Sequence, residues 1–71
     1  MNIKPTWIRF NNKDNVFIKK EAIIGFRVEL LEILGKIEYL IHLYTTGSNI
    51  ILDYNKDKES YETDLNLLKG D

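Results

Sequence analysis

Val28-Glu29-Leu30-Leu31-Glu32-Ile33-Leu34-Gly35 is the stretch on which the fold class depends, because two local structures fit it. As a helix, it gives two turns that end at Gly35 in a left-handed cap. As a strand, it leads into a two-residue hairpin at Gly35-Lys36, with a β-bulge where Leu30 and Leu31 are adjacent. Residues 23–28 are poor helix formers and favour the strand. The segment 20–34 stays open between strand and helix.

Apolar residues alternate with mixed residues through the first half of the chain. Alternation with a period of two is typical of strands. After Gly35 the apolar phase moves to the odd positions of 37–43, and a further apolar set follows at 50, 52 and 54. Polar turn signals at 11–15, 46–49 and 55–57 separate these runs. The inward row expected for the first half is Ile8, Phe10, Val16, Ile18, Ile24, Phe26, Val28 and Leu30.

The last segment changes to a helical period. Asp57 suits an N-cap, and Glu59 lies in the first turn, where negative charge favours the helix dipole. Tyr61, Leu65 and Leu68 follow at i, i+4 and i+7. This pattern predicts a helix over about 57–69 with one narrow apolar stripe.

Together these segments predict a single small β-rich domain over residues 1–71. Its fold class is α+β: a four- or five-stranded antiparallel meander sheet with a C-terminal helix. One helix, about 10–12 Å wide, is too narrow for a sheet whose strands are nearly 5 Å apart. We therefore expect the sheet to curl into a half-barrel, or a second copy or a partner to cover the remainder. Self-association as a homodimer or higher oligomer is the favoured outcome.

Composition and charge narrow the classes of function. Ten Lys and Arg against eleven Asp and Glu give a net charge of -1, which indicates neither a DNA-coating protein nor an acidic mimic of nucleic acid. The chain has no Cys, so disulfides and thiolate chemistry are excluded, and the first residues hold no long apolar run. We expect a cytoplasmic protein without a membrane partner. Ile, Lys, Asn and Tyr supply 29 of the 71 residues, which favours a low-GC bacterial, phage or mobile-element genome.

Catalytic and metal-binding motifs are missing from the sequence. His42 is the only histidine, and it lacks the spacing to a second His or Cys that a zinc site needs. The run 45–49 has hydroxyl groups and one glycine but no lysine, so it indicates a hairpin turn rather than a phosphate loop. No serine is framed as a nucleophile elbow. The sequence therefore predicts no enzyme, no catalytic residue, no cofactor and no metal.

A mixed aromatic and basic row on the odd positions is the most informative surface. Trp and Arg are enriched in protein–protein hot spots, and aromatic side chains beside cations also bind single-stranded nucleic acid. Alternatively, the chain's own loops bury the rings of Trp7 and Phe17, and these rings have no binding role. The predicted partner-binding residues are Trp7, Arg9, Phe17, Lys19 and Arg27 from this row, together with His42 and Tyr44 from the outward even positions after Gly35.

The sequence thus predicts a small non-enzymatic protein-interaction or regulatory module that acts through an exposed sheet face or edge. The alternative is a module that binds single-stranded nucleic acid on its aromatic and basic face.

Overall fold

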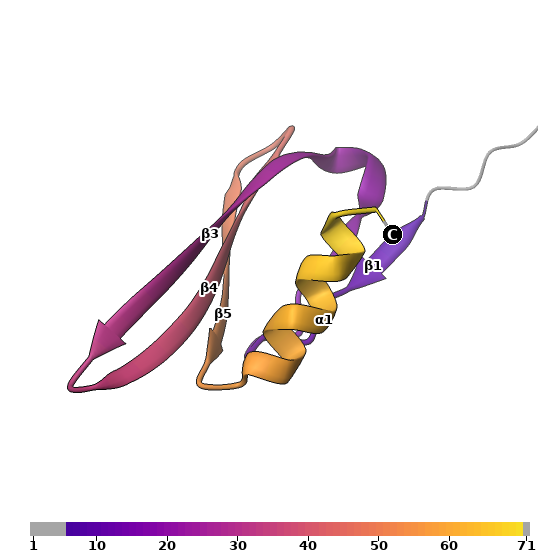
Figure 1. Ribbon diagram of the computed structural model, residues 1–71. Coiled ribbons are helices and arrows are strands. Elements are labelled where there is room, and N and C mark those ends of the chain that lie inside the picture. The colour runs from indigo at the N-terminus through magenta and orange to yellow at the C-terminus, as the bar shows by residue number, and fades with distance from the viewer. Residues whose placement is uncertain (1–5, 71) are drawn as a thin grey trace, which may run out of the picture.

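The computed structural model describes residues 6–70 and is an α+β fold with two antiparallel sheets and one C-terminal helix (Figure 1). Strands β1 and β2 form the first sheet, and the second has the order β3-β4-β5. A short 3-10 turn, η1, joins the two sheets. The elements are β1 (Trp7–Arg9), β2 (Phe17–Lys19), η1 (Lys20–Ala22), β3 (Ile23–Ile33), β4 (Lys36–Thr45), β5 (Asn49–Asn55) and α1 (Lys58–Leu68).

The prediction of one four- or five-stranded meander is wrong, because β1 and β2 do not join the sheet of β3, β4 and β5. The physical reason lies at η1, where Lys20 N donates to Thr6 O at 2.7 Å and ties the end of β2 back towards β1. The chain then enters β3 in a new direction. The half-barrel of a single sheet is replaced by two separate sheets.

Residues 23–33 form a strand, so the β interpretation of the open segment is confirmed. The hairpin turn lies at Leu34 and Gly35, one residue earlier than predicted. Both residues have positive φ, 51° and 77°, as a type I′ turn requires. Leu34 is a non-glycine residue in a left-handed conformation, which costs about 1–2 kcal/mol for an L-residue.

The β-bulge predicted near Leu30 and Leu31 lies elsewhere. The pairing of β3 with β4 runs without a shift from Gly25 to Ile33, and the register changes between Ile23 and Gly25. The extra residue, Ile24, is 70% exposed, whereas Ile23 packs against the core. Ile24 therefore does not belong to the inward row that the alternation predicts, because the bulge reverses the phase at this one position.

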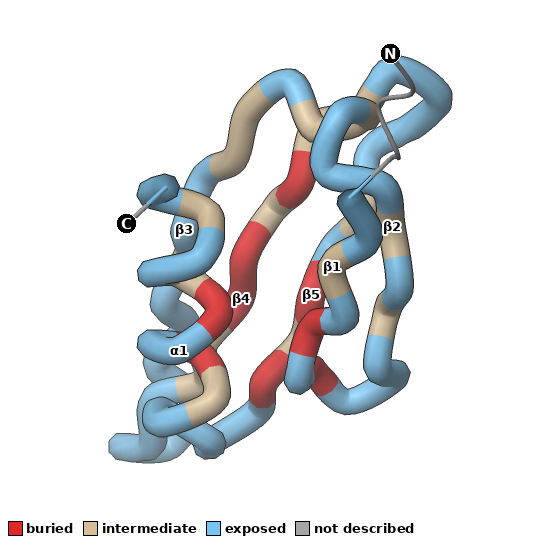
Figure 2. The backbone as a smooth tube through the Cα atoms, turned by 90° about the vertical axis from the view of Figure 1, so that its right-hand side faces the viewer, coloured by how far each residue is buried: buried red, intermediate tan, exposed pale blue. Residues whose placement is uncertain are grey.

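The core lies between the three-stranded sheet on one side and α1 with the β1–β2 ribbon on the other. Figure 2 shows α1 and the β1–β2 ribbon on either side of β5, with buried stretches on β4 and β5. Ile41 and Leu43 of β4 and Leu52 of β5 are fully buried. The ribbon contributes Phe10, which is also fully buried, together with the partly buried Ile8, Val16 and Ile18. The ribbon thus covers part of the sheet that α1 alone is too narrow to cover.

The C-terminal helix begins and packs as its sequence predicts. The Asp57 side chain caps it by accepting from Ser60 N at 3.0 Å. Tyr61 is buried, with its ring centroid 4.9 Å from that of Tyr39. Leu65 and Leu68 are partly buried against the core. The apolar stripe of the helix therefore faces β4 and β5.

Asp64, one position before Leu65, is the fully buried polar residue of the helix. Its carboxylate accepts from Asn11 N at 2.6 Å, from Asn11 Nδ2 at 2.9 Å and from Tyr54 OH at 2.6 Å. The helix, β5 and the loop after β1 are joined at this one side chain. The same loop reaches the outer edge of β5, where Lys13 N donates to Asp53 O at 2.8 Å.

Candidate functional site

Four of the predicted partner-binding residues form one cluster on the β1–β2 ribbon, here named the aromatic platform: Trp7, Arg9, Phe17 and Lys19. In the register of the ribbon, Trp7 lies opposite Lys19 and Arg9 opposite Phe17. The two rings are stacked with centroids 5.1 Å apart and planes at 12°. They remain 48% and 61% exposed, because Ile8 and Ile18 take the core-facing side of the ribbon. The alternative prediction, that the chain's own loops bury these two rings, is therefore wrong.

Lys19 also contributes to the aromatic platform. Its Nζ lies 5.4 Å from the centre of the Trp7 ring, within the range of a cation–π contact. The Trp7 ring thus already has the Phe17 ring and the Lys19 ammonium against it. Part of the aromatic surface that a nucleobase needs for stacking is therefore occupied within the chain.

The other three predicted residues, Arg27, His42 and Tyr44, lie on β3 and β4 and not on the ribbon. Arg27 faces His42 across the two strands, and its Nε donates to Tyr44 OH at 3.3 Å. His42 Nε2 lies 2.8 Å from Glu29 Oε1. This group, here named the outer-face cluster, is on the side of the sheet away from α1. The structure therefore distributes the predicted residues over two separate sheets.

The hairpin of β3 and β4 continues beyond β5, and sequence reasoning did not single out this part. The pairing of β4 with β5 ends at Tyr39 and Asn55, whereas β3 and β4 pair as far as Ile33 and Lys36. Residues 30–38, here named the hairpin arm, thus have no third strand beside them in the described chain (Figure 1). Its exposed apolar side chains are Leu30, Leu31, Ile33, Leu34 and Ile37.

Apolar side chains occupy both faces of the hairpin arm. Leu30 lies on the face towards α1, whereas Leu31 and Ile33 lie on the opposite face with Glu38 and Lys36 as cross-strand neighbours. Leu34 at the turn is 96% exposed. A signal was present in the sequence, because the adjacent Leu30 and Leu31 break the alternation and place apolar groups on both faces.

The outer edge of β3 is the longest unpaired strand edge among residues 6–70. β3 has 11 residues and pairs only with β4. An unpaired edge presents backbone N–H and C=O groups to another chain. At the opposite side of the sheet, the edge of β5 is contacted by Lys13. The two edges of this sheet are therefore not equivalent.

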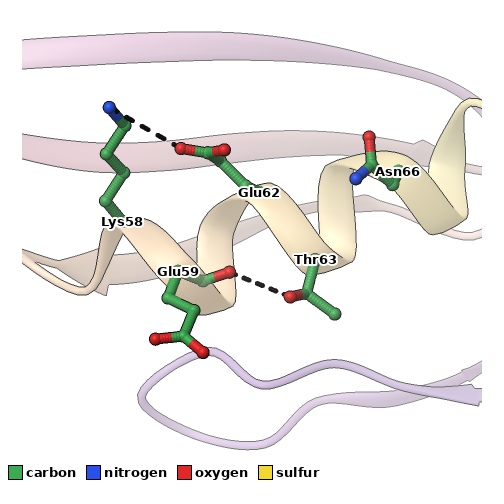
Figure 3. Close-up of a pocket in the computed structure, with 5 residues that line it drawn as sticks. All are labelled: Lys58, Glu59, Glu62, Thr63 and Asn66. Atoms are coloured by element: carbon green, nitrogen blue, oxygen red, sulfur yellow. Dashed lines mark hydrogen bonds and ion pairs between the residues drawn. The ribbon is translucent and has the colours of Figure 1, made fainter.

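Figure 3 shows a wide depression on the outer side of α1, lined by Lys58, Glu59, Glu62, Thr63 and Asn66. Its groups contact one another: Lys58 Nζ lies 3.7 Å from Glu62 Oε1, and Thr63 Oγ1 donates to Glu59 O at 3.0 Å. No group of three His, Cys, Asp or Glu side chains suited to a metal ion occurs within residues 6–70.

Asp64 is a fully buried carboxylate whose hydrogen bonds hold elements of the fold together. Its oxygens accept three hydrogen bonds, two from Asn11 and one from Tyr54. Burial and donation to Asp64 raise the pKa of Tyr54 well above its usual range, so this phenol stays protonated. The pair joins α1 to β5.

Comparison of the chain with protein-family models, with curated proteins and with solved structures finds no match. Among the described residues, no helix is long and apolar enough to cross a membrane. The cytoplasmic location predicted from the sequence stays a prediction. Any function must therefore be inferred from the surfaces described above.

Proposed function

We propose that this chain is a non-enzymatic protein-interaction module that self-associates through its hairpin arm. The observation that carries the proposal is the exposure of five large apolar side chains on the arm, where neither α1 nor the β1–β2 ribbon reaches. Contiguous exposed apolar surface is typical of interaction sites. A second copy is the occupant that the charge pattern of β3 fits, as the next subsection argues.

The energetics of the hairpin arm support a contact role. Fully burying a Leu or Ile side chain is worth about 1.5–3 kcal/mol, so burying the exposed parts of these five side chains, which are 37–96% exposed, supplies several kcal/mol. Leu34 adds a second argument, because a leucine with φ of 51° is unfavourable for the isolated hairpin, where Asn or Gly suits the turn. A residue that opposes local stability and is 96% exposed is best explained by a contact that it makes in an assembly.

The aromatic platform is a second binding surface in this proposal. Arg9 and Lys19 flank the stacked rings, so the segment that fits is a stretch of a partner protein with acidic side chains. Single-stranded nucleic acid is the alternative occupant. It is disfavoured by the net charge of -1 and by the Phe17 and Lys19 contacts that occupy the Trp7 ring.

The oligomeric state tests the role of the hairpin arm. We expect sedimentation velocity at micromolar concentrations to show a dimer or higher oligomer of the parent chain. Ile33→Thr and Leu34→Asn on the arm should weaken it. Ile51→Thr is the matched control, because Ile51 is exposed to a similar degree, 59% against 48% for Ile33, but lies on β5. A parent chain that stays monomeric overturns the proposal, as does equal weakening by Ile33→Thr and Ile51→Thr.

A further inference from the structure

We propose that two copies pair β3 with β3 in antiparallel orientation, about a two-fold axis at Val28, to form one continuous six-stranded sheet. The pairing rests on the proposed function, since it requires self-association, and it names the contact and its register. Residues 25–31 of one copy lie opposite residues 31–25 of the other.

The edge of β3 is suited to such pairing because of its length and its unpaired backbone. In the described chain it has a neighbour on one side only. β5 is shorter, with 7 residues, and its edge accepts the Lys13 N–H at Asp53. Pairing of two sheets through their β3 edges therefore satisfies more unpaired backbone N–H and C=O groups than pairing through their β5 edges would.

Two-fold symmetry limits the registers that are available. When a two-fold axis perpendicular to the sheet relates two identical antiparallel strands, the core-facing sides of both strands lie on the same side of the joined sheet. Each residue therefore lies opposite one of equal parity, and the axis passes through one residue of β3. Only a few centres keep the middle of β3 paired: Arg27, Val28, Glu29 or Leu30.

The charges of β3 select Val28 among these centres. With the axis at Val28, Arg27 lies opposite Glu29 of the second copy, and symmetry makes this pair twice. On the core-facing side Phe26 lies opposite Leu30, again twice. Opposite charges and apolar pairs directly across a ladder stabilise it by about 0.2–1 kcal/mol each, whereas like charges in that position destabilise it.

Each neighbouring register places unfavourable groups opposite one another. An axis at Arg27 sets the two Arg27 side chains face to face. An axis at Glu29 does the same for the two glutamates and sets Phe26 opposite Glu32. An axis at Leu30 sets Val28 opposite Glu32 on the core-facing side. The Val28 register is the one of the four in which every pair over residues 26–30 is complementary.

The outer-face cluster is arranged to accept this pairing. Glu29 approaches His42 with Oε1, at 2.8 Å, which leaves the second carboxylate oxygen for the guanidinium of the other copy. Arg27 contacts Tyr44 through Nε, at 3.3 Å, which leaves its terminal nitrogens available. In the dimer, Arg27 of one copy, which contacts Tyr44, would also contact Glu29 of the other copy. That Glu29 in turn contacts His42 of its own chain. This gives three of the predicted site residues, Arg27, His42 and Tyr44, a shared role.

Steric fit agrees at the ends of the paired segment. Leu31 lies opposite Gly25, which has no side chain and whose built Cβ position meets only Tyr44 Cδ2, at 3.8 Å. The hairpin arm then continues along the second copy towards its Ile23. There Ile23 borders a pocket of about 140 Å³ that is also lined by Ile8, Lys20, Leu67 and Leu68.

Cysteine cross-linking tests the register directly, since the parent chain has no Cys. Val28→Cys should form a disulfide-linked dimer under mild oxidation, because directly opposed Cα atoms, about 4.5–5.5 Å apart, suit a disulfide. Leu30→Cys is the matched control on the same face of the same strand. In this register its two copies are offset by four residues, roughly 13 Å, and cannot link. Linking by Leu30→Cys and not by Val28→Cys overturns the register.

Charge reversal provides a second readout. Arg27→Glu and Glu29→Arg should each weaken the dimer by about tenfold, because each sets like charges opposite one another twice. An equimolar mixture of the two variants should restore dimers, since every Glu then faces an Arg. Lys56→Glu, an exposed charge change in the turn between β5 and α1, lies outside β3 and the hairpin arm and should leave the affinity unchanged. Failure of the mixture to dimerise contradicts the Arg27–Glu29 pair.

The outcomes separate the two proposals. A parent chain that is monomeric in sedimentation removes self-association altogether. A dimer that depends on Ile33 and Leu34, but shows neither the Val28→Cys link nor rescue by charge reversal, removes the register and leaves the hairpin arm as the contact.

Discussion

Individual side chains decide how the elements of this small fold are held together, and Asp64 has the largest share. Its carboxylate is fully buried and receives donors from β5 and from the loop after β1. A buried charge is tolerated only while its hydrogen bonds are complete, because a lost partner leaves it with an uncompensated desolvation cost. Asp64 lies three residues after Tyr61 and four before Leu68, so helical periodicity places it on the buried face. Its residue type, which is almost never fully buried without a partner, is what points to solvent in the sequence.

Tyr54→Phe should destabilise the protein by about 1–3 kcal/mol, because Asp64 loses its phenolic donor while the ring still fills the core. Thermal or urea unfolding measures the change. Tyr44→Phe is the control, since the Tyr44 hydroxyl contacts only the exposed Arg27 side chain and its loss should be nearly neutral. Equal destabilisation by the two variants would show that the buried pair has no special role.

The hydrogen bonds of the Asp57 carboxylate let us predict how the stability of the fold depends on pH. Hydrogen bonds from the backbone and side chain of Ser60 hold the pKa of Asp57 below its usual 3.8. A lowered carboxyl pKa stabilises the fold above the unfolded-state value and loses that contribution as pH falls through the folded-state value. Asp57→Asn keeps a capping oxygen but does not titrate. The stability advantage of the parent over this variant should therefore shrink as pH falls below 3.8, as urea unfolding at several pH values would show; an advantage that is constant with pH contradicts this role.

At the scale of elements, the β1–β2 ribbon separates what the sequence predicts from what it does not. Alternation identifies Ile8, Phe10, Val16 and Ile18 as inward residues, and all four contact the core. Strand partners are set by tertiary contacts, here the Lys20 to Thr6 hydrogen bond after β2, which no periodicity records. The bulge at Ile24 escapes prediction for a related reason, because its position depends on how β3 pairs with β4.

The aromatic platform gives a prediction that distinguishes its two candidate occupants. Trp7→Ala and Arg9→Glu should abolish partner capture and leave the far-UV spectrum and melting transition nearly unchanged, because both side chains face away from the core. An acidic protein segment should show a moderate dependence of affinity on salt. Single-stranded nucleic acid should show a steep one, with a slope of about -0.7 per phosphate contact. Unfolding of the Trp7→Ala variant would place this ring in the core and end its proposed binding role.

For the whole molecule, the central question is how so small a chain covers its sheet. The width of one helix correctly indicates that α1 alone is insufficient. The ribbon covers part of the remainder, and the hairpin arm stays exposed. The residues of the outer-face cluster and the aromatic platform could be chosen from the sequence as exposed groups. Their division between two sheets could not, since the alternation that marks Trp7, Arg9, Phe17, Lys19 and Arg27 as outward does not record which strands pair.

Self-association should also affect the midpoint of thermal unfolding. If folded copies associate, the midpoint of thermal unfolding rises with protein concentration, because association stabilises the native state by mass action. We expect this rise for the parent chain and a smaller one for Leu34→Asn, although the isolated variant should be more stable by about 1 kcal/mol through relief of the left-handed leucine. A midpoint independent of concentration in both proteins contradicts self-association.

The hydrogen bond from Lys13 N to Asp53 O should limit uncontrolled polymerisation of the protein. A sheet with two open edges can add molecules without limit and grow into a fibril. In the proposed dimer the β3 edges of two copies would satisfy each other about a closed two-fold axis, and the loop around Lys13 would obstruct the edge that is left over. Growth would then stop at two molecules. Lys13→Pro removes the N–H that contacts Asp53 but leaves the Asn11 hydrogen bonds to Asp64 in place. It should turn a dimer that stays in solution into one that aggregates, as light scattering would show.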